Sequence, residues 1–339
     1  MKLRGAISGF GEVAAKAHLA AWRTREDVNL AVIHDPIAQR RHEAIRLIKN
    51  VRVYDDLELM LDGEAPDFVD IASPPALHGA AARTALNAGA HVLVEKPLSL
   101  SLAEFDELAV VAHASHRVLM CVHNWKFAPA YSLAHALVDE GRIGSVRSIS
   151  LERLRVAPAG KGGPGAAWRT GPESGGGILI DHGWHVFYLM QWLMGGALPR
   201  TVAATLCTNP EGVDETAEVY VTFDGGVRAR ADLSWQAGQR RTHATIVGTN
   251  GSLEIGGERV LLTEGQRRPQ EFLVHDIPDD SYHSEWFSGV AAAFEEAISH
   301  GPDSTIARAN LVEARSALAV ILAARVSAKN RGSQTSIVA

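Results

Sequence analysis

Two kinds of hydrophobic pattern follow one another along the chain. From residue 3 to residue 121, short unbroken apolar runs alternate with longer stretches of helical periodicity. Unbroken apolar runs are typical of strands buried on both faces, and their alternation with helices predicts a parallel sheet with crossover helices. The expected strands are 3–8, 30–34, 68–71, 91–94 and 118–122, and the expected helices are 13–25, 38–48 and 80–88.

Beyond residue 145 the strand-like runs follow one another with only turns between most of them. Asp224-Gly225-Gly226 and Thr249-Asn250-Gly251 contain turn dipeptides that are typical of tight hairpins. This pattern predicts a mainly antiparallel sheet covered by helices, and we expect the tail 327–339 to be frayed. The expected strands are 146–156, 201–208, 217–223, 227–235, 242–247 and 251–255, and the expected helices are 130–140, 178–194, 284–299 and 305–326.

Length and charge narrow the class of protein. With 339 residues the chain exceeds one ordinary domain of ~100–150 residues, so we expect two domains, 1–122 and 123–339. Thirty-three basic and 39 acidic residues give a net charge of −6, which argues against a nucleic-acid partner. Two cysteines fit a reducing compartment, and no apolar run approaches the ~18 residues of a membrane span. We expect no signal peptide, no membrane partner and a cytoplasmic location.

Glycine is slightly in excess, with 31 of 339 residues. Eight glycines and three prolines lie in the 22 residues of segment 156–177, between an expected strand and an expected helix. Such a segment is either a surface loop or a binding loop, since loops longer than ~12–15 residues are often functional.

A second group of glycines follows the first expected strand and opens a helix. Gly9 permits a tight turn, Gly11 allows a pyrophosphate to approach the main chain, and Ala14 keeps helix and strand close. Asp35 ends the second expected strand, where a carboxylate binds the adenosine ribose, although it is equally a turn residue before Pro36. The pattern predicts a dinucleotide site. Asp35 favours NAD, and the nearby arginines leave NADP possible; they are Arg40 and Arg41.

Several ordered motifs make the chain similar to a known family. They are Ile71 to His78, Gly89 to Pro97 with Glu95-Lys96-Pro97, His123 to Pro129, Gly141 to Gly144, Trp168-Arg169 with Ser174 to His185, and Gly248 to Leu253. Together they resemble the glucose–fructose oxidoreductase/inositol dehydrogenase (Gfo/Idh/MocA) family over most of the chain. The resemblance implies an α/β protein with an N-terminal Rossmann parallel sheet. It also implies a C-terminal α+β domain with a large, mainly antiparallel open sheet that binds substrate and forms a homodimer or homotetramer.

The resemblance also implies a cofactor site. It adds the loops at Ser73 and at Glu95 to the glycine motif, and the cofactor is NAD, with NADP possible. The expected cofactor-binding residues are Gly9, Phe10, Gly11, Glu12, Val13, Asp35, Ser73, Pro74, His78, Glu95 and Lys96.

Asp181 and His185 are four residues apart and share a face if the segment is helical. By themselves they are equally an N-cap carboxylate and a structural histidine. A histidine with its ordinary pKa near ~6.5 suits general-base chemistry on an alcohol. With Lys96, the pair resembles the family's catalytic Lys/Asp/His triad at the interdomain cleft. Lys96 then either stabilises the alkoxide or relays the proton, and Asp181 orients either the substrate hydroxyl or the histidine. In the family the Lys-Pro peptide is often cis, and Lys96-Pro97 is the corresponding bond.

Aromatic and polar residues near these motifs suit a polyhydroxy substrate. Flat indole faces contact the C–H surface of a sugar, and polar groups bond hydroxyls or a carboxylate. Core packing is the alternative for each tryptophan, including Trp184. Lys126 stands where many relatives carry an arginine, so bidentate anion recognition there is in doubt. The expected substrate-binding residues are Lys96, Trp125, Lys126, Trp168, Arg169, Asp181, His182 and His185.

The leading hypothesis is an NAD(P)-dependent oxidoreductase that transfers a hydride between nicotinamide and a secondary alcohol or ketone of a sugar, amino sugar, cyclitol or related compound. One alternative is an NAD-assisted glycoside hydrolase or lyase with an internally recycled cofactor. Another is a non-catalytic nucleotide-binding sensor. Asp181, His182 and His185 are possible metal ligands, but His182 and its neighbour point different ways on a helix, so we expect no metal.

Overall fold

The computed structural model describes residues 2–160, 167–171, 175–275 and 282–338. Its contacts divide the chain into two units, of which one joins Met1–Asn124 with Ile277–Val312 and the other joins Trp125–Asp276 with Glu313–Ala339. The predicted boundary after residue 122 is close to the first crossing between the units. The prediction that all of 123–339 forms the second domain differs from this division, because Ile277–Val312 groups with the first unit.

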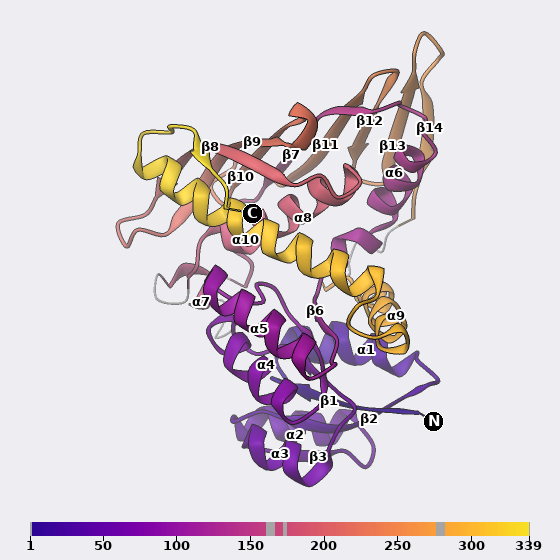
Figure 1. The fold of residues 1–339 in the computed structure, drawn as a ribbon, viewed down its shortest axis with the longest axis vertical. Helices are drawn as coiled ribbons and strands as arrows, with labels where there is room; N and C mark the ends of the chain where they lie inside the picture. Colours follow the sequence, from indigo (N-terminus) through magenta and orange to yellow (C-terminus); the bar gives the residue numbers. More distant parts are fainter. Residues whose placement is uncertain (1, 161–166, 172–174, 276–281, 339) are drawn as a thin grey trace. The chain divides into compact units, whose positions relative to one another are not determined.

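The first unit is built on a parallel sheet, as the apolar runs predicted. Among the described residues this sheet has six strands in the order β3-β2-β1-β4-β5-β6, with every pairing parallel. This is the strand order of a dinucleotide-binding doubly wound fold, in which the switch point lies between β1 and β4. The strands are β1 Leu3–Ser8, β2 Val28–His34, β3 Arg52–Tyr54, β4 Phe68–Ile71, β5 His91–Val94 and β6 Leu119–Cys121 (Figure 1).

Helices connect these strands. The expected helix 13–25 begins with a π-helical turn and continues as an α-helix. The α3 and α5 helices and strand β3 were not predicted. The helical segments of the first unit are η1 Ala14–His18, α1 Leu19–Arg23, α2 Ala38–Leu47, α3 Leu57–Glu64, η2 Pro75–Leu77, α4 His78–Asn87, α5 Leu102–Ala114 and α9 Ser284–His300.

An aromatic cluster explains why α9 belongs to the first unit. Trp22 of α1 packs on Phe68 of β4 with ring centroids 4.8 Å apart, and Phe68 meets Phe294 of α9 edge-on at 5.7 Å. Phe287 of α9 stacks on His18 at 3.8 Å. These rings are buried, and aromatic burial of this size contributes strongly to a core. The far C-terminal part of the sequence therefore completes the N-terminal core.

A side chain forms hydrogen bonds with the backbone of the edge strand β6. Asn310, on the first turns of α10 (Thr305–Lys329), accepts a hydrogen bond from the Cys121 N–H at 2.8 Å and donates one to the Cys121 carbonyl at 2.9 Å. The carboxamide thus stands in for a neighbouring strand at an edge that would otherwise expose its polar groups. Cys121 is fully buried, and burial raises the pKa of its thiol.

The second unit contains a large sheet that is mainly antiparallel, as predicted. Among the described residues it has nine strands in the order β14-β13-β12-β11-β7-β10-β9-β8-β15, and only the β7–β10 pair is parallel. The strands are β7 Val146–Leu154, β8 Pro199–Thr208, β9 Asp214–Phe223, β10 Arg228–Ser234, β11 Arg241–Gly248, β12 Gly251–Gly256, β13 Arg259–Glu264, β14 Gln270–Leu273 and β15 Thr335–Ser336.

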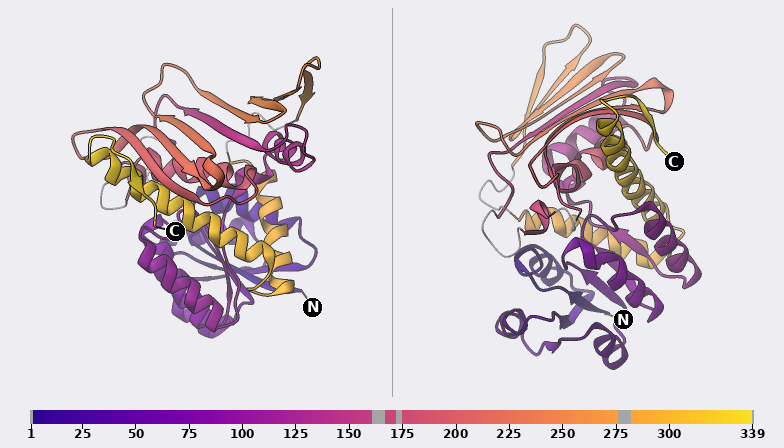
Figure 2. Two further views of the ribbon diagram at one scale, coloured as in Figure 1. Left: turned by 45° about the horizontal axis from the view of Figure 1, so that its top comes forward. Right: turned by 90° about the vertical axis from the view of Figure 1, so that its left-hand side faces the viewer.

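Helices lie on one face of this sheet (Figure 2). Buried residues alternate with exposed ones along β9 and β10, which is the pattern of a sheet with one covered face. The helical segments of the second unit are η3 Asn124–Phe127, which begins at the last residue of the first unit, α6 Pro129–Asp139, α7 Ala167–Thr170, η4 Leu179–Gly183, α8 Trp184–Leu193, η5 Asp224–Gly226 and the larger part of α10.

The prediction of a frayed tail was wrong. The α10 helix continues to Lys329, and β15 then pairs antiparallel with β8. The Ile337 N–H donates to the Arg200 carbonyl at 2.9 Å, and the Ile337 side chain is buried. Short polar sequences such as this one carry no periodicity, so only the neighbouring strand reveals the pairing.

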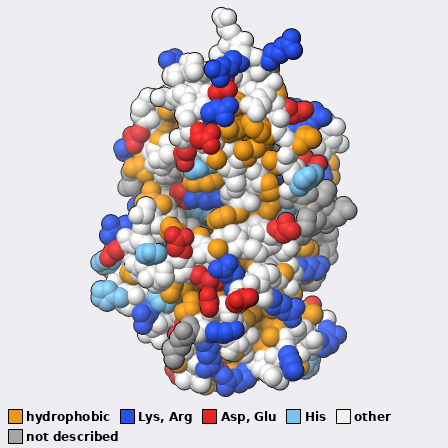
Figure 3. All heavy atoms as spheres, turned by 90° about the vertical axis from the view of Figure 1, so that its right-hand side faces the viewer, with side chains coloured by type: hydrophobic (Ala, Val, Ile, Leu, Met, Phe, Trp, Pro, Cys, Tyr) orange, Lys and Arg blue, Asp and Glu red, His pale blue; other side chains and the backbone are white. Residues whose placement is uncertain are grey.

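Charged side chains of both signs are interspersed over the face shown in Figure 3, which agrees with the modest net charge. Within the described ranges, no helix is both long enough and apolar enough to cross a membrane.

A buried carboxylate holds the η4 turn that precedes α8. Asp214 is 3% exposed; it accepts the Leu179 N–H at 2.8 Å and pairs with Arg325 of α10 at 2.9 Å. Gly177 has φ +118° and lies so close to this carboxylate that an added Cβ would collide with it.

Asp214→Ala is expected to lower the free energy of unfolding by about 3 kcal/mol, because it leaves a buried N–H and a partly buried guanidinium without their acceptor. Urea denaturation of the purified chain measures this loss. Asp224→Ala, which removes the exposed carboxylate paired with Arg200, is the matched control and is expected to lower the free energy of unfolding clearly less than Asp214→Ala does. Equal losses of stability in the two variants would contradict a structural role of the buried Asp214 carboxylate.

Candidate functional site

The glycine motif turns sharply at the end of β1, as the sequence predicted. Gly9 has φ +91°, and a Cβ at this position would lie 2.5 Å from the Ser73 nitrogen, so only glycine fits between the two loops. At Gly11 an added Cβ would meet nothing closer than the Arg40 guanidinium carbon at 4.0 Å. The main chain at Gly11 is therefore open to a ligand, and Ala14 is fully buried against the sheet. This is the cradle that a dinucleotide pyrophosphate requires.

Asp35 is fully buried at the end of β2 and braces the glycine loop. Its Oδ2 accepts the Phe10 N–H at 2.8 Å, and its Oδ1 accepts the Ile37 N–H at 2.8 Å. Arg40 approaches the same carboxylate at 3.4 Å. The turn function that the sequence left open is therefore present, and ribose binding by Asp35 stays a prediction. Among the other motif residues, the Phe10 side chain is buried, while Glu12 is exposed and pairs with Lys16 at 3.1 Å and Val13 is also exposed.

The loop after β4 offers a polar atom to a ligand. Ser73 Oγ is buried and makes no hydrogen bond within the described part of the chain. His78 is 1% exposed; its Nδ1 lies 2.6 Å from the Pro97 carbonyl oxygen and its Nε2 lies 2.7 Å from the Ser73 carbonyl oxygen. Burial lowers the pKa of His78. His78 thus ties the β4 loop to the β5 loop, and direct contact with a cofactor stays a prediction, as it does for Pro74.

The loop after β5 carries Glu95, Lys96 and Pro97, and the Lys96–Pro97 bond is cis, as the resemblance implied. One Glu95 oxygen accepts the Lys96 N–H at 3.0 Å, and the other lies 3.2 Å from His18 Nε2. His18 Nδ1 lies 2.9 Å from Asp70 Oδ2, which also accepts the Trp22 indole N–H at 2.7 Å. A buried histidine therefore connects β4 with the lysine loop.

The charge state of His18 follows from its neighbours. Burial by itself lowers the pKa of His18, but the Asp70 carboxylate and then the Glu95 carboxylate outweigh it and raise the pKa to about 9. Burial raises the pKa of Glu95, yet the His18 hydrogen bond and charge bring it below its ordinary value. The chain thus buries an imidazolium between two carboxylates. The sequence analysis missed both His18 and Asp70, because neither lies in a motif.

In the second unit, Asp181 and His185 lie on one continuous helical segment. Asp181 belongs to the π-helical turn η4 and His185 to α8, so the expected uniform helix 178–194 is wound more widely at its start. Asp181 is 3% exposed and accepts a hydrogen bond from Arg169 Nε at 3.2 Å, while His182 Nε2 lies 3.7 Å away. Arg169 in turn lies over the Trp168 ring at 4.5 Å. Four predicted substrate residues thus lie together in this unit.

His185 is 7% exposed and is held from two sides. Its Nδ1 lies 3.2 Å from the Tyr188 hydroxyl, which also accepts the Trp125 N–H at 2.9 Å. Its ring stacks on the Trp125 indole, with centroids 4.5 Å apart and planes 6° from parallel. The Arg153 guanidinium carbon lies 4.5 Å from the same indole. Trp125 therefore positions His185, and Trp184 is fully buried in the core.

Lys126, one of the predicted substrate-binding residues, is held in an ion pair. Its ammonium binds both oxygens of Glu313 at 2.6 and 2.7 Å and lies 5.3 Å from the Trp192 ring. Lys126 and Glu313 are 16% and 6% exposed at their side chains, so the pair joins the start of this unit to α10. A contact between Lys126 and the substrate stays a prediction.

Sequence reasoning missed Tyr188, Tyr131 and Arg153, although Tyr188 follows His185 by one helical turn. Segment 156–177, which the sequence leaves as either a surface loop or a binding loop, is described only in part, because 161–166 and 172–174 lie outside the described residues.

The comparisons with known proteins agree with this geometry. Residues 3–123 match a family model described as an oxidoreductase family with an NAD-binding Rossmann fold, and residues 131–254 match the GFO/IDH/MocA C-terminal domain. The chain therefore belongs to the Gfo/Idh/MocA family of oxidoreductases. It is an NAD-dependent enzyme of this family, with NADP as the possible alternative cofactor.

Named relatives act on sugars and cyclitols. The chain is 31% identical over 203 residues to a D-glucoside 3-dehydrogenase of Escherichia coli, covering 60% of this chain and 57% of that protein. It is 30% identical over 207 residues to a scyllo-inositol 2-dehydrogenase (NADP(+)) of Bacillus subtilis, covering 59% and 60%. The solved structure of GenD2 from gentamicin A biosynthesis in complex with NAD matches with a TM-score of 0.84 at 25% identity, covering 100% of this chain and 97% of that one.

Gly9→Ala is expected to lower the stability of the fold, whereas Gly11→Ala is expected to lower the affinity for NAD. Gly9→Ala forces a left-handed backbone and a main-chain collision, so it is expected to cost at least about 1–2 kcal/mol in the free energy of unfolding. Gly11→Ala meets no neighbour and is expected to keep the stability while weakening NAD binding at least about tenfold. Denaturation curves and NAD titrations measure both quantities. A stable Gly9→Ala variant would contradict the described turn.

The His18 pKa of about 9 lies above the ordinary value of 6.5, so the stability that the protonated ring contributes is complete below about pH 6.5 and is lost as the pH rises through 9. The free energy of unfolding is expected to fall by up to about 3 kcal/mol between these pH values. His18→Gln is expected to abolish this part of the pH dependence, whatever its own stability. Urea denaturation of both proteins from pH 6 to 9.5 tests it, and parallel curves would refute the buried imidazolium.

Proposed function

We propose that the enzyme transfers a hydride between a nicotinamide cofactor and a secondary alcohol or ketone of a sugar, amino sugar, cyclitol or related polyhydroxy compound. The observation that carries the proposal is the open main chain at Gly11 in a chain that also holds His185 beside Asp181 on one helical segment. The relatives named for glucoside and inositol oxidation support the substrate class.

NAD fits the first unit. The open backbone at Gly11 accepts the pyrophosphate, the buried Ser73 hydroxyl is available to the ligand, and Asp35 lies at the β2 end where the ribose is bound in such folds. NAD, when bound, supplies the hydride acceptor. The nearby Arg40 is suited to a 2′-phosphate, which keeps NADP as the alternative.

His185 takes the alcohol proton in this proposal. Oxidation converts the carbinol C–H and O–H into a carbonyl, so the proton must leave as the hydride leaves. We assign proton acceptance to Nε2, because Nδ1 faces the Tyr188 hydroxyl and the Trp125 stack fixes the ring. In the reverse direction the same group returns the proton to the carbonyl oxygen.

Lys96 stabilises the developing alkoxide, and Asp181 orients the substrate hydroxyl directly or through Arg169. The bond between the Lys96 N–H and Glu95 and the buried His18 behind it support a defined position of the lysine main chain. Arg169, Trp168 and His182 complete the polar and aromatic surroundings of Asp181.

The C-terminal sheet is the proposed surface for a homodimer or homotetramer, and a cytoplasmic location stays a prediction. Size-exclusion chromatography with light scattering measures the oligomeric state.

Lys96→Ala and His185→Ala are each expected to lower turnover by about 10²–10⁴-fold, since each removes a group that acts in the transition state. NAD affinity is expected to stay within about threefold of that of the unaltered enzyme, because neither side chain forms the pyrophosphate cradle. A panel of sugars and cyclitols read by NAD(P)H absorbance identifies the working substrate first. Exposed Lys49→Ala and His300→Ala serve as matched controls.

Unchanged turnover in either Lys96→Ala or His185→Ala would overturn the assignment of roles. Release of an aglycone without net NADH formation would instead indicate a hydrolase or lyase that recycles its cofactor. NAD binding without any reaction would indicate a sensor.

A further inference from the structure

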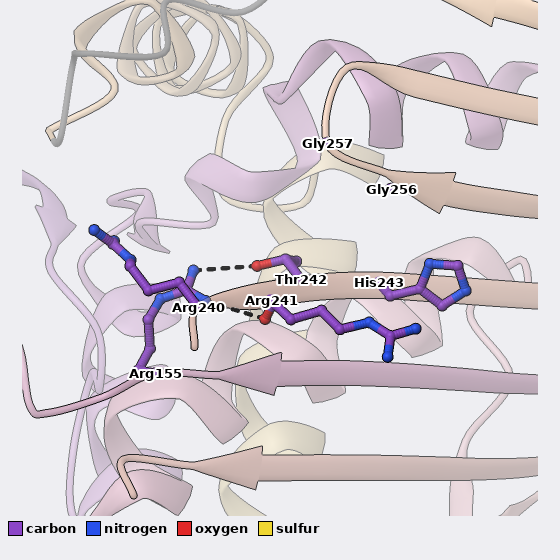
Figure 4. Close-up of a pocket in the computed structure, with 7 residues that line it drawn as sticks. All are labelled: Arg155, Arg240, Arg241, Thr242, His243, Gly256 and Gly257. Carbon is purple, nitrogen blue, oxygen red and sulfur yellow. Dashed lines mark hydrogen bonds between the residues drawn. The ribbon is translucent and has the colours of Figure 1, made fainter. Parts of the chain in front are cut away.

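Two surface hollows of the second unit are lined by arginines, and they differ in how these charges are compensated. In one hollow, Arg142 and Arg267 both pair with Glu264, at 2.8 and 3.6 Å. The other hollow has a volume of about 460 Å³ and lies at the adjoining ends of β7 and β11. It is lined by Arg155, Arg240, Arg241, Thr242, His243, Gly256 and Gly257 (Figure 4).

The second hollow carries excess positive charge. Arg241 is paired with Glu152 at 3.1 Å. Arg155 donates only to backbone carbonyls and to Thr242, and neither it nor Arg240 has a carboxylate partner within the described part of the chain. In Figure 4 the side chains of Arg155 and Arg240 lie on the same side of Thr242, and the end of Arg240 points away from this threonine, whereas Arg241 extends toward His243. Two guanidinium groups therefore share one side of the hollow without a counter-charge.

A third arginine converges on the same place. Arg153 Nη1 and Arg155 Nη2 both donate to Thr242 Oγ1, at 2.8 and 3.1 Å. One neutral hydroxyl cannot balance two cations. Arg153 Nε is buried and makes no hydrogen bond among the described residues. The carboxylate in electrostatic range of Arg153 is Asp181, which already binds Arg169.

Mutual repulsion and burial of these guanidinium groups favour the binding of an anion. Burial, reinforced by Arg155, lowers the pKa of Arg153 to about 9, and burial, reinforced by Arg240, lowers that of Arg155 to about 10. Tyr131 lies in range of both Arg153 and Arg155, and its buried hydroxyl has no hydrogen-bond partner within the described ranges. A bound anion would relieve the repulsion and give these donors an acceptor.

The cluster is also linked to the proposed proton acceptor. The Arg153 guanidinium lies over one ring, Trp125, that itself stacks on His185, each contact being 4.5 Å long. A single aromatic side chain thus separates the arginines from the group to which the proposed function gives the alcohol proton.

We propose that this hollow binds the anionic group of the substrate, so that the enzyme acts on a polyhydroxy compound bearing a carboxylate or a phosphate. Arg155 and Arg240 bind the anion, and Arg153 and Tyr131 support it from behind. The inference rests on the proposed function for the reaction, but anion binding itself can be measured without turnover. A carboxylate is planar and a phosphate is tetrahedral, but each presents two oxygens that arginine binds with paired hydrogen bonds.

Calorimetric titration of the full chain at constant ionic strength tests the site directly. The probes are inorganic phosphate, D-glucuronate, D-galacturonate and D-glucose 6-phosphate, with D-glucose and D-galactose as neutral counterparts. At least one acid or phosphate is expected to bind at least about tenfold more tightly than its neutral counterpart. Arg155→Gln and Arg240→Gln are each expected to weaken that binding at least about fivefold. Arg267→Gln, in the compensated hollow, is the matched control and is expected to change it less than about twofold.

Kinetics distinguish this inference from the proposed function. NAD(P)H formation with acids or sugar phosphates, with a raised KM and nearly unchanged kcat in Arg155→Gln, supports both, and the better of the two substrate types identifies the anion. Binding that depends on Arg155 and Arg240 without any turnover supports the anion site and contradicts the proposed function. Turnover of neutral sugars alone, equal affinity for charged and neutral probes, or equal effects of Arg267→Gln overturns the anionic substrate.

Discussion

The buried imidazolium of His18 constrains the first unit more than any other single group. It lies between the carboxylates of Asp70 and Glu95 and under the ring of Phe287, so it joins the first helix, two strand ends and α9 at one point. A buried charge is tolerated only where partners surround it, and here each partner also depends on the others. Glu95 then holds the Lys96 main chain. The position of the lysine loop is therefore set from inside the core.

In the second unit, aromatic stacking and buried ion pairs hold the candidate site residues in place. Trp125 supports His185 on its ring, and Tyr188 joins the two by hydrogen bonds to the Trp125 main chain and to the imidazole. Asp214 accepts the Leu179 N–H and so fixes the start of the helical segment that carries Asp181. The arginines beside Thr242 differ from these paired groups, because Arg153 and Arg155 converge on one neutral hydroxyl.

Much of the architecture could be predicted because burial leaves a direct trace in the sequence. The strands of the parallel sheet are apolar on both faces, and the glycine motif has a backbone geometry that few other residues permit. The short edge strand β3 and the terminal strand β15 left no such trace, since they are only partly buried. The contacts group Ile277–Val312 with the first unit, whereas the sequence placed this segment in the second domain. Helical periodicity shows that a helix has a buried face but not which core receives it.

The sequence by itself indicated most of the helices and strands, the dinucleotide turn and the candidate residues Lys96, Asp181 and His185. These depend on local backbone preferences and on short motifs. Only the tertiary structure decided how the polar residues pair. It paired Lys126 with Glu313, surrounded His18 with two carboxylates, and brought Arg153 and Arg155 together on the Thr242 hydroxyl. Pairing of charges depends on distances between residues far apart in the chain, and no local pattern encodes those distances.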